Sequence, residues 1–234
     1  MQRLKPETIP AHGARLQNCG QGAWMADRVV RLAGSVLLPV RMMVLENEPG
    51  CLTCYSPVEL DSATLEAMAG LGSVQQIVVA NRFHTLYVAA ASEYFPTAKL
   101  YVPPTSPGIT GIVPNAMISQ LASNTEMFVL RMRAGFEELI LYHDKSETLV
   151  VSDLFFNLTG ATRLQKFLLR LNGIADRPAQ SRLHKLLLMR EKEQIRKFYR
   201  WALAKPFTQI CMAHGQLIDY EAREVFYQLF HRYR

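Results

Sequence analysis

The chain has 234 residues, of which 49% are hydrophobic and 20% are charged, and its formal net charge is +6 at pH 7. A chain of this length and composition can bury a substantial core as one domain (residues 1–234), which excludes an intrinsically disordered protein. No apolar run reaches the roughly 18 to 20 residues that a membrane-spanning helix needs, so we expect no transmembrane segment.

Residues 1–30 show no clear periodicity of apolar residues and contain Trp24 and several glycines. We expect them to wrap around the surface of the domain. The first residues, MQRLKPETIPAHG, carry charge but are not followed by an apolar segment, so they do not have the pattern of a signal peptide. A cytoplasmic protein is the resulting expectation.

A β-hairpin is predicted next, with strands over residues 35–45 and 51–56 and a turn over 47–50. The second strand contains Cys51 and Cys54, which have the CxxC spacing of redox and zinc motifs. Residues three apart on a strand point to opposite faces, and no second CxxC completes a zinc site. We therefore interpret these cysteines as packing residues.

Strand–helix units follow the hairpin. Asp61 is a suitable N-cap for a helix over residues 63–71, whose apolar residues recur at helical spacing. Strands are then predicted over 74–80 and 99–102, with a helix over 85–94 between them. The next segment, PPTSPGITGIVPNA, is rich in Pro and Gly and is predicted to be a loop.

The second half of the chain repeats this alternation. Its predicted strands are 126–131, 138–142, 147–151 and 207–213, and its predicted helices are 162–171, 179–203 and 221–232. Strands in hairpins, followed by strands and helices in alternation, favour two sheets in the middle with helices outside. The predicted fold class is therefore a layered α/β protein.

The long helix 179–203 carries most of the surplus charge, since residues 182–200 contain seven Lys or Arg and two Glu. A solvated helix face is the simpler interpretation, and binding of an anionic polymer or membrane surface is the alternative. No recognisable nucleic-acid-binding motif accompanies the charge, so nucleic acid is not an expected partner. Leu183, Leu187, Ile195 and Phe198 predict that one side of the helix packs inward.

Three of the predicted buried strands end in polar residues. They lead to Asn81 with His84, to Asp153, and to His214. Ligands in α/β sheets bind beyond the carboxyl ends of strands, so these three ends suggest one shared site. Two imidazoles and a carboxylate can bind a divalent metal. Taken singly, each residue has a simpler role: Asn81 as a helix cap, Asp153 in a loop hydrogen bond, and His214 as a satisfied buried histidine.

Several segments between about Arg41 and Ile218 resemble those of a known family: R-M-M-V-L with C-Y-S-P-V, V-V-A-N-R-F-H, Y-F-P-T-A-K-L-Y-V-P-P, V-V-S-D-L-F-F-N-L and A-H-G. Their order resembles the metallo-β-lactamase-like hydrolases, and within them a poorly characterised branch of unknown function. The resemblance implies an αββα sandwich of two mixed β-sheets flanked by helices.

Members of that superfamily have a His-x-His-x-Asp-His motif, which binds two metals, at the place where this chain has Asn81. Its four ligand positions are occupied here by Asn81, Phe83, Thr85 and Leu86, none of which is a good metal ligand. His84 matches none of them. The resemblance therefore implies that the usual two-metal motif is missing.

The resemblance also assigns roles to two later residues. Asp153 matches the family's metal-bridging aspartate after a strand, and His214 matches its last histidine before a glycine. The family's middle histidine has no counterpart, because His143 is too close to a hairpin turn. We therefore expect no two-zinc centre.

Three functions remain open from the residues. The first is a degenerate domain without metal, which binds a small molecule or a protein as a binding or scaffolding module. The second is a hydrolase of an ester, amide or phosphoester, with one zinc, iron or manganese ion held by His84, Asp153 and His214. In it Asp153 and His214 are the catalytic residues and Asn81 contacts the substrate. The third is anionic-surface binding by the basic helix.

Overall fold

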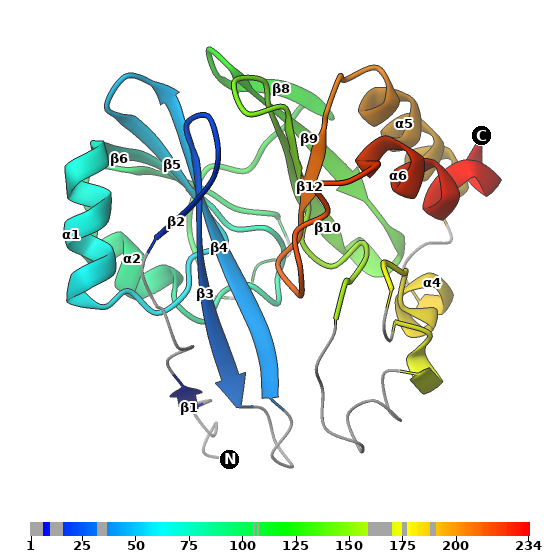
Figure 1. Ribbon diagram of the computed structural model, residues 1–234, viewed down its shortest axis with the longest axis horizontal. Helices are drawn as coiled ribbons and strands as arrows, with labels where there is room; N and C mark the ends of the chain where they lie inside the picture. The colour runs from blue at the N-terminus through cyan, green and yellow to red at the C-terminus, as the bar shows by residue number, and fades with distance from the viewer. Residues whose placement is uncertain are drawn as a thin grey trace.

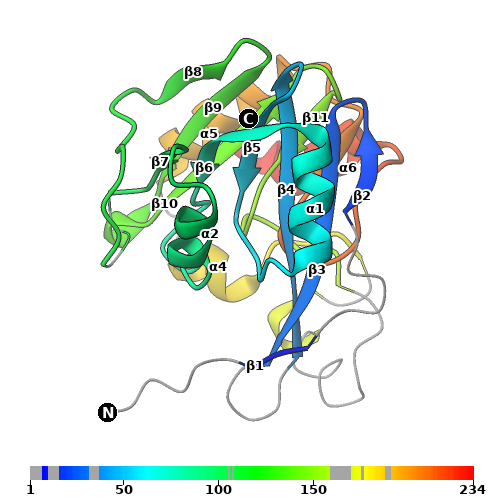
Figure 2. The same ribbon diagram turned by 90° about the vertical axis from the view of Figure 1, so that its left-hand side faces the viewer.

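The computed structural model describes residues 7–9, 16–31, 37–104, 106, 108–158, 170–174, 177–187 and 191–234. Within them, two mixed β-sheets pack face to face, and helices lie against the outer side of each sheet (Figures 1 and 2). The predicted αββα sandwich is confirmed.

The first sheet has the strand order β1-β3-β4-β5-β6-β7, and β2 pairs with β3 at one end. Its strands are β1 (Glu7–Ile9), β2 (Gln17–Gly20), β3 (Ala23–Arg31), β4 (Leu37–Glu48), β5 (Cys51–Tyr55), β6 (Ser73–Val78) and β7 (Lys99–Tyr101). Neighbours up to β5 are antiparallel, whereas β5, β6 and β7 run parallel. Helices α1 (Ser62–Leu71) and α2 (Val88–Tyr94) cover the outer face of this sheet (Figure 1).

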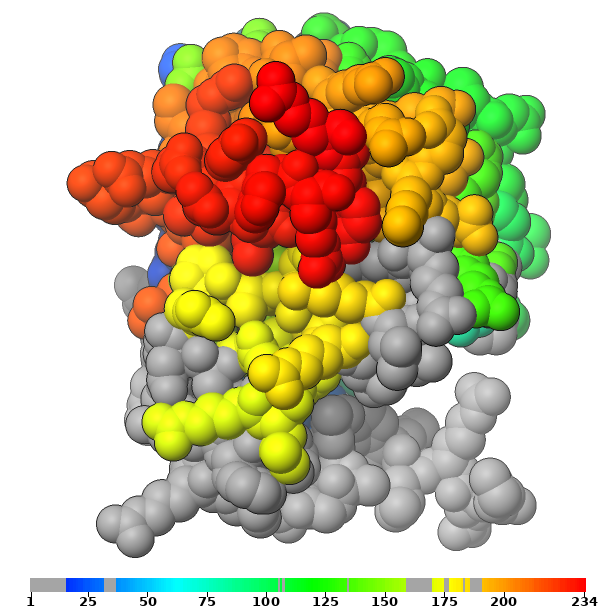
Figure 3. All heavy atoms as spheres, turned by 90° about the vertical axis from the view of Figure 1, so that its right-hand side faces the viewer, coloured from blue at the N-terminus to red at the C-terminus, as the bar shows by residue number. Residues whose placement is uncertain are grey.

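The second sheet has the order β12-β11-β10-β9-β8, and only the β11–β12 pair is parallel. Its strands are β8 (Ile118–Ala122), β9 (Thr125–Arg131), β10 (Glu137–His143), β11 (Thr148–Val150) and β12 (Gln209–Cys211), with the short helix η2 (Arg133–Gly135) between β9 and β10. Helices α5 (Lys192–Leu203) and α6 (Ala222–Phe230) pack on its outer face, followed by η3 (His231–Tyr233). The short helix α4 (Arg182–Leu187) lies beside α6 (Figure 3).

The core is divided by the alternation of side chains along the strands. In β4, Met43 and Leu45 point between the two sheets, while Met42 and Val44 point outward toward α1. Strands β9 and β10 alternate in the same way between the inner layer and the layer under α5 and α6. A strand that is buried on both faces reads as a continuous apolar run, which is why these strands were predictable.

The cysteines of the CxxC pair behave as packing residues. Cys54 is fully buried and its Sγ lies 3.3 Å from the Met42 Sδ. Burial raises the pKa of the Cys54 thiol to about 12, so the thiolate needed for redox or metal chemistry is disfavoured. All four cysteines of the chain are free thiols.

The expected surface wrap over residues 1–30 is wrong for the described part of that segment. Residues 17–31 form the β2–β3 hairpin, and β3 pairs with β1, β2 and β4 inside the first sheet. The buried residues Ala23, Ala26 and Val30 alternate with partly exposed ones, including Asp27, which hid the strand from a search for apolar runs. Strand β8 was also missed, because it is a short edge strand with exposed Ile118.

The expected single helix over residues 179–203 is replaced by α4 and α5. Ser181 precedes α4, and its Oγ accepts a hydrogen bond from the backbone N–H of His184 at 3.2 Å, as an N-cap does. Glu191 has ψ 71°, outside the helical range, so α5 begins after it. Residues 188–190 lie outside the described residues, as does most of the predicted helix 162–171.

Helix α5 buries Ile195 and Phe198, as the apolar stripe predicted, and it also buries Trp201. Its Lys and Arg residues therefore lie mainly on the opposite, solvent-facing side. The burial of Leu183 and Leu187, the other two residues of the stripe, lies outside what the structure describes. Among the described residues, no helix is both long and apolar enough to cross a bilayer.

Candidate functional site

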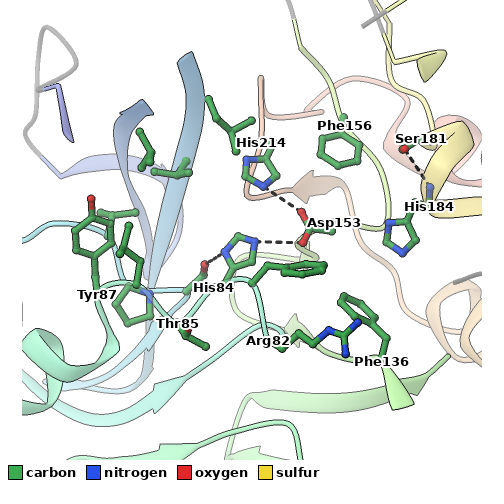
Figure 4. Close-up of a pocket in the computed structure, with 18 residues that line it drawn as sticks. Arg82, His84, Thr85, Tyr87, Phe136, Asp153, Phe156, Ser181, His184 and His214 are labelled. Atoms are coloured by element: carbon green, nitrogen blue, oxygen red, sulfur yellow. Dashed lines mark hydrogen bonds and ion pairs between the residues drawn. The ribbon is translucent and has the colours of Figure 1, made fainter. Parts of the chain in front are cut away.

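The carboxyl ends of β6, β11 and β12 meet at one end of the sandwich. The two sheets are joined there by the backbone N–H of Leu139, which donates to the carbonyl of Ala80 at 2.8 Å. His84 follows β6, Asp153 follows β11 and His214 follows β12. One potential ligand atom from each of these three side chains lies within 4.8 Å of the other two (Figure 4). The structure thus brings together the three residues that were proposed to share a site.

Asp153 lies at the centre of the group. Its Oδ1 is 3.0 Å from His214 Nε2, and its Oδ2 is 3.4 Å from His84 Nε2. Burial alone would raise the pKa of this carboxyl, but the charge of His84 and the hydrogen bonds from both histidines outweigh burial. The pKa of Asp153 is therefore held well below its ordinary value, and the side chain is a carboxylate at neutral pH.

Each histidine is oriented through its other ring nitrogen. The Nδ1–H of His214 donates to the Pro39 carbonyl at 2.7 Å, and His84 Nδ1 is 2.6 Å from Ser56 Oγ. Both Nε2 atoms already have partners in this arrangement: His84 Nε2 is 2.8 Å from Ser152 Oγ and His214 Nε2 is 3.0 Å from Asp153 Oδ1, so an ion would have to replace these contacts. Both Nε2 atoms face Asp153. Burial opposes a charge on His214, yet the hydrogen bond that its Nε2–H donates to the Asp153 carboxylate raises the pKa of His214 above the ordinary value.

Glu138 holds the backbone of the loop that carries Ser152 and Asp153. Glu138 is fully buried, and its Oε1 and Oε2 accept the backbone N–H groups of Ser152 at 2.7 Å and of Asp153 at 3.2 Å. Burial, with the nearby charge of Asp153, raises the pKa of Glu138 to about 8. Sequence reasoning missed this residue. The signal was an acidic residue directly before the apolar run of β10, where a charge seldom lies unless it has a structural partner.

Asn81 has a different role from the two that we expected. It does not cap α2, which begins at Val88 after Tyr87. It is fully buried, its Oδ1 accepts the N–H of Phe83 at 2.9 Å, and its Nδ2 donates to Asp153 Oδ2 at 2.8 Å. Its amide is thus occupied in shaping the corner and orienting Asp153, rather than in contacting a substrate.

A cavity of about 760 Å³ opens above the three residues, and both Asp153 and His214 line it. Its walls are mainly apolar and include Phe136 and Phe156, the latter stacked on the ring of His214 with a 5.5 Å centroid separation. Phe83, 65% exposed, lies at the rim. A concave, apolar space of this size with a few convergent polar groups is typical of a small-molecule site.

His184 of α4 also lines this cavity, although no pattern in the sequence predicts its place there. It is 7% exposed, and its ring contacts Phe136 edge-on with 5.9 Å between centroids. Burial lowers its pKa, so it is mainly neutral at pH 7. The segment that carries it is far along the chain from the three strand ends, and only the folded arrangement of α4 brings it to the cavity.

No protein-family model and no curated protein matches the chain. Solved structures do resemble it. The mono-zinc form of the metallo-β-lactamase FIM-1 from Pseudomonas aeruginosa has a TM-score of 0.62 at 15% identity, covering 93% of this chain and 94% of that one. A metallo-β-lactamase from Hirschia baltica has a TM-score of 0.61 at 10% identity, covering 98% of each chain. TMB-1 has a TM-score of 0.65 at 10% identity, covering 93% and 96%.

Proposed function

From the metallo-β-lactamase fold that these likenesses establish, we propose that the protein is a hydrolase that uses one divalent metal ion held by His84, Asp153 and His214. The observation that carries the proposal is the convergence of one ligand atom from each residue within 4.8 Å of the others, at the floor of a cavity.

The residues present fit a metal in their chemistry. Two imidazole nitrogens and a carboxylate oxygen are a donor set that zinc, iron and manganese all accept. The hydrogen bonds of His214 to Pro39 and of His84 to Ser56 are the second-shell contacts that orient metal-binding histidines. FIM-1, a protein of the same fold, has been described in a mono-zinc form.

A second metal is not part of the proposal. The four positions of the motif that binds two metals in the resembling superfamily hold Asn81, Phe83, Thr85 and Leu86. Asn81 is buried and bonded to Asp153, and Phe83 is 65% exposed at the rim of the cavity. None of these side chains offers a ligand that would hold a second ion.

A divalent metal at this site supplies a water of lowered pKa, which can attack an ester, amide or phosphoester near neutral pH. The residues of the chain orient the ligands of the metal and exclude water. Asn81 orients the Asp153 carboxylate, and Glu138 holds the backbone N–H of Asp153. Pro39 and Ser56 orient the rings of the two histidines, and the apolar walls exclude bulk water. Removal of water strengthens every charge interaction at the floor of the cavity.

A metal-free binding module remains the second candidate, and one observation favours it. Asp153 already has polar partners on both carboxylate oxygens without an ion, namely Asn81 and the two histidines. In that case the same group is an internal ion-pair network that closes the floor of a ligand pocket.

Elemental analysis of the purified protein separates the two. The metal hydrolase predicts near-stoichiometric zinc, iron or manganese, which is lost in His214→Ala and in His84→Ala. His231→Ala is the matched control, because His231 is an exposed histidine outside the cavity lining, whose Nδ1 lies 3.1 Å from the Gln228 carbonyl oxygen. Absence of metal from the wild type, even after incubation with excess zinc, would leave the binding module as the function.

A further inference from the structure

An arginine without a counter-ion lies in the wall of the cavity. The guanidinium carbon of Arg82 is 5.4 Å from the ring centroid of Phe83 and 5.4 Å from that of Phe136 (Figure 4). Within the described part of the chain, no acidic side chain pairs with Arg82. A half-buried guanidinium that has only aromatic faces for partners keeps its hydrogen-bond donors free for an anion.

A second unsatisfied group lies near the same ring. His184, whose imidazole contacts Phe136, has its Nε2 buried, and among the described residues no hydrogen-bond partner reaches that atom. Buried polar atoms without partners are uncommon in folded proteins, and an ordered water, an ion or a bound ligand accounts for most of them. The guanidinium carbon of Arg82 and the ring centroid of His184 lie 5.4 Å and 5.9 Å from the centroid of the Phe136 ring.

The remainder of the cavity suits an apolar molecule. Its wall includes Val30, Leu38, Val58, Leu86 and Phe156, and Phe83 stands exposed at its rim. The carboxylate of Asp153 at the floor is already matched by the two histidines. The charge of Arg82 is therefore the one that remains uncompensated in the described lining of the cavity.

We propose that the cavity binds an amphiphilic anion, in which an apolar ring or chain carries one anionic oxygen group, either a carboxylate or a phosphate. Arg82 pairs with the anionic group, His184 Nε2 gives the polar end a hydrogen bond, and the apolar part packs between Phe136, Phe156 and the aliphatic wall. The assignment of this anion as the substrate rests on the proposed hydrolase, whereas the binding of the anion to the cavity does not depend on that proposal.

The test uses two fluorescent probes of similar shape on the protein as purified. One is 8-anilino-1-naphthalenesulfonate, an aromatic anion, and the other is N-phenyl-1-naphthylamine, which lacks the anionic group. We expect the wild type to bind the anion at least about tenfold more tightly, since a charged hydrogen bond in an apolar site contributes that much. Arg82→Gln should remove this preference and leave the neutral probe within about twofold.

Two further variants complete the design. Arg200→Gln removes an exposed arginine on α5, far from the cavity lining, and should change neither affinity. His184→Leu keeps the apolar volume and should weaken the anionic probe by about threefold or more. Circular dichroism and thermal unfolding of each variant establish that it is folded before its affinity is compared.

Displacement of the anionic probe by decanoate or by decyl phosphate then identifies the preferred head group, and either result supports the inference when it depends on Arg82. Equal affinity of the wild type for both probes, or an unchanged anion affinity in Arg82→Gln, would overturn it. An Arg82-dependent affinity in a protein that holds no metal would reject the hydrolase while leaving the anion site intact. Bound metal in a protein whose anion affinity does not depend on Arg82 would reject the anion site and leave the proposed hydrolase intact.

Discussion

Replacement of Ser56 by alanine tests whether the second-shell hydrogen bond of His84 organises a metal site. Ser56 Oγ lies 2.6 Å from His84 Nδ1, and the side chain of His84 is only 10% exposed. Loss of the hydroxyl leaves a largely buried ring nitrogen without its partner, which costs about 1 to 2 kcal/mol. The backbone of Ser56 keeps its bond to the Val78 carbonyl, so the loop itself should persist.

Because about 1.4 kcal/mol corresponds to a factor of ten, we expect Ser56→Ala to weaken zinc binding by about tenfold or more. Competition with a chromophoric chelator measures the Kd directly. Ser146→Ala is the control, since Ser146 Oγ makes a 2.7 Å bond to the Nδ1 of His143, away from this site. Unchanged zinc affinity in Ser56→Ala, measured beside a wild type that binds zinc, would refute the reasoning.

Three further predictions concern stability. Gly215→Ala should cost at least about 3 kcal/mol and abolish the site, because φ is +101° and the new Cβ would lie 2.1 Å from the Asn157 carbonyl oxygen. Gly70→Ala, with no atom within 4 Å, should be neutral or stabilising in the same urea unfolding assay. Asp61→Ala should lower the free energy of unfolding by about 2 to 4 kcal/mol, because it removes the cap of α1 and the carboxylate paired with the buried Arg28. Asp61→Asn keeps a capping oxygen and should retain part of that stability. In chelator-treated protein, the raised pKa of Glu138 makes its contribution to stability decline as pH rises toward 8, whereas the depressed pKa of Asp153 makes its own contribution present above about pH 4 and lost as pH falls. The stability of the wild type relative to Glu138→Gln should therefore fall between pH 5 and 8, and a relative stability that rises over this range would contradict the sign.

The sequence predicted those parts of the fold that local patterns control. Strands β4, β5 and β10 are apolar runs bounded by turns, and Asp61 accepts the Thr64 N–H at 2.8 Å as a cap should. The polar residues after β6, β11 and β12 were predictable for the same reason, since a buried strand must end where polar residues begin.

The support of the site could not be predicted. The partner of His214 is the carbonyl of Pro39, and a backbone carbonyl leaves no signal in the residue type. Ser56 and His84 are 28 residues apart, and Glu138 reaches Ser152 across 14 residues, so only the register of the sheets brings them together. Asn81 was misjudged because an asparagine after a strand is more often a cap than a buried donor to a carboxylate.

The position of β12 at the edge of its sheet has a kinetic consequence. The strand has three residues and is the outermost strand of the described sheet, and His214 follows it after two residues. The outer side of β12 is paired through Ile210 with Ile218, and all three of its residues are buried, so this edge opens only when those two hydrogen bonds break. Exchange of an ion held by His214 would then proceed through fraying of this edge, at a rate set by opening rather than by the strength of the coordination bonds. The amide protons of Gln209–Cys211 would report that opening through hydrogen exchange, which should slow when the site is filled.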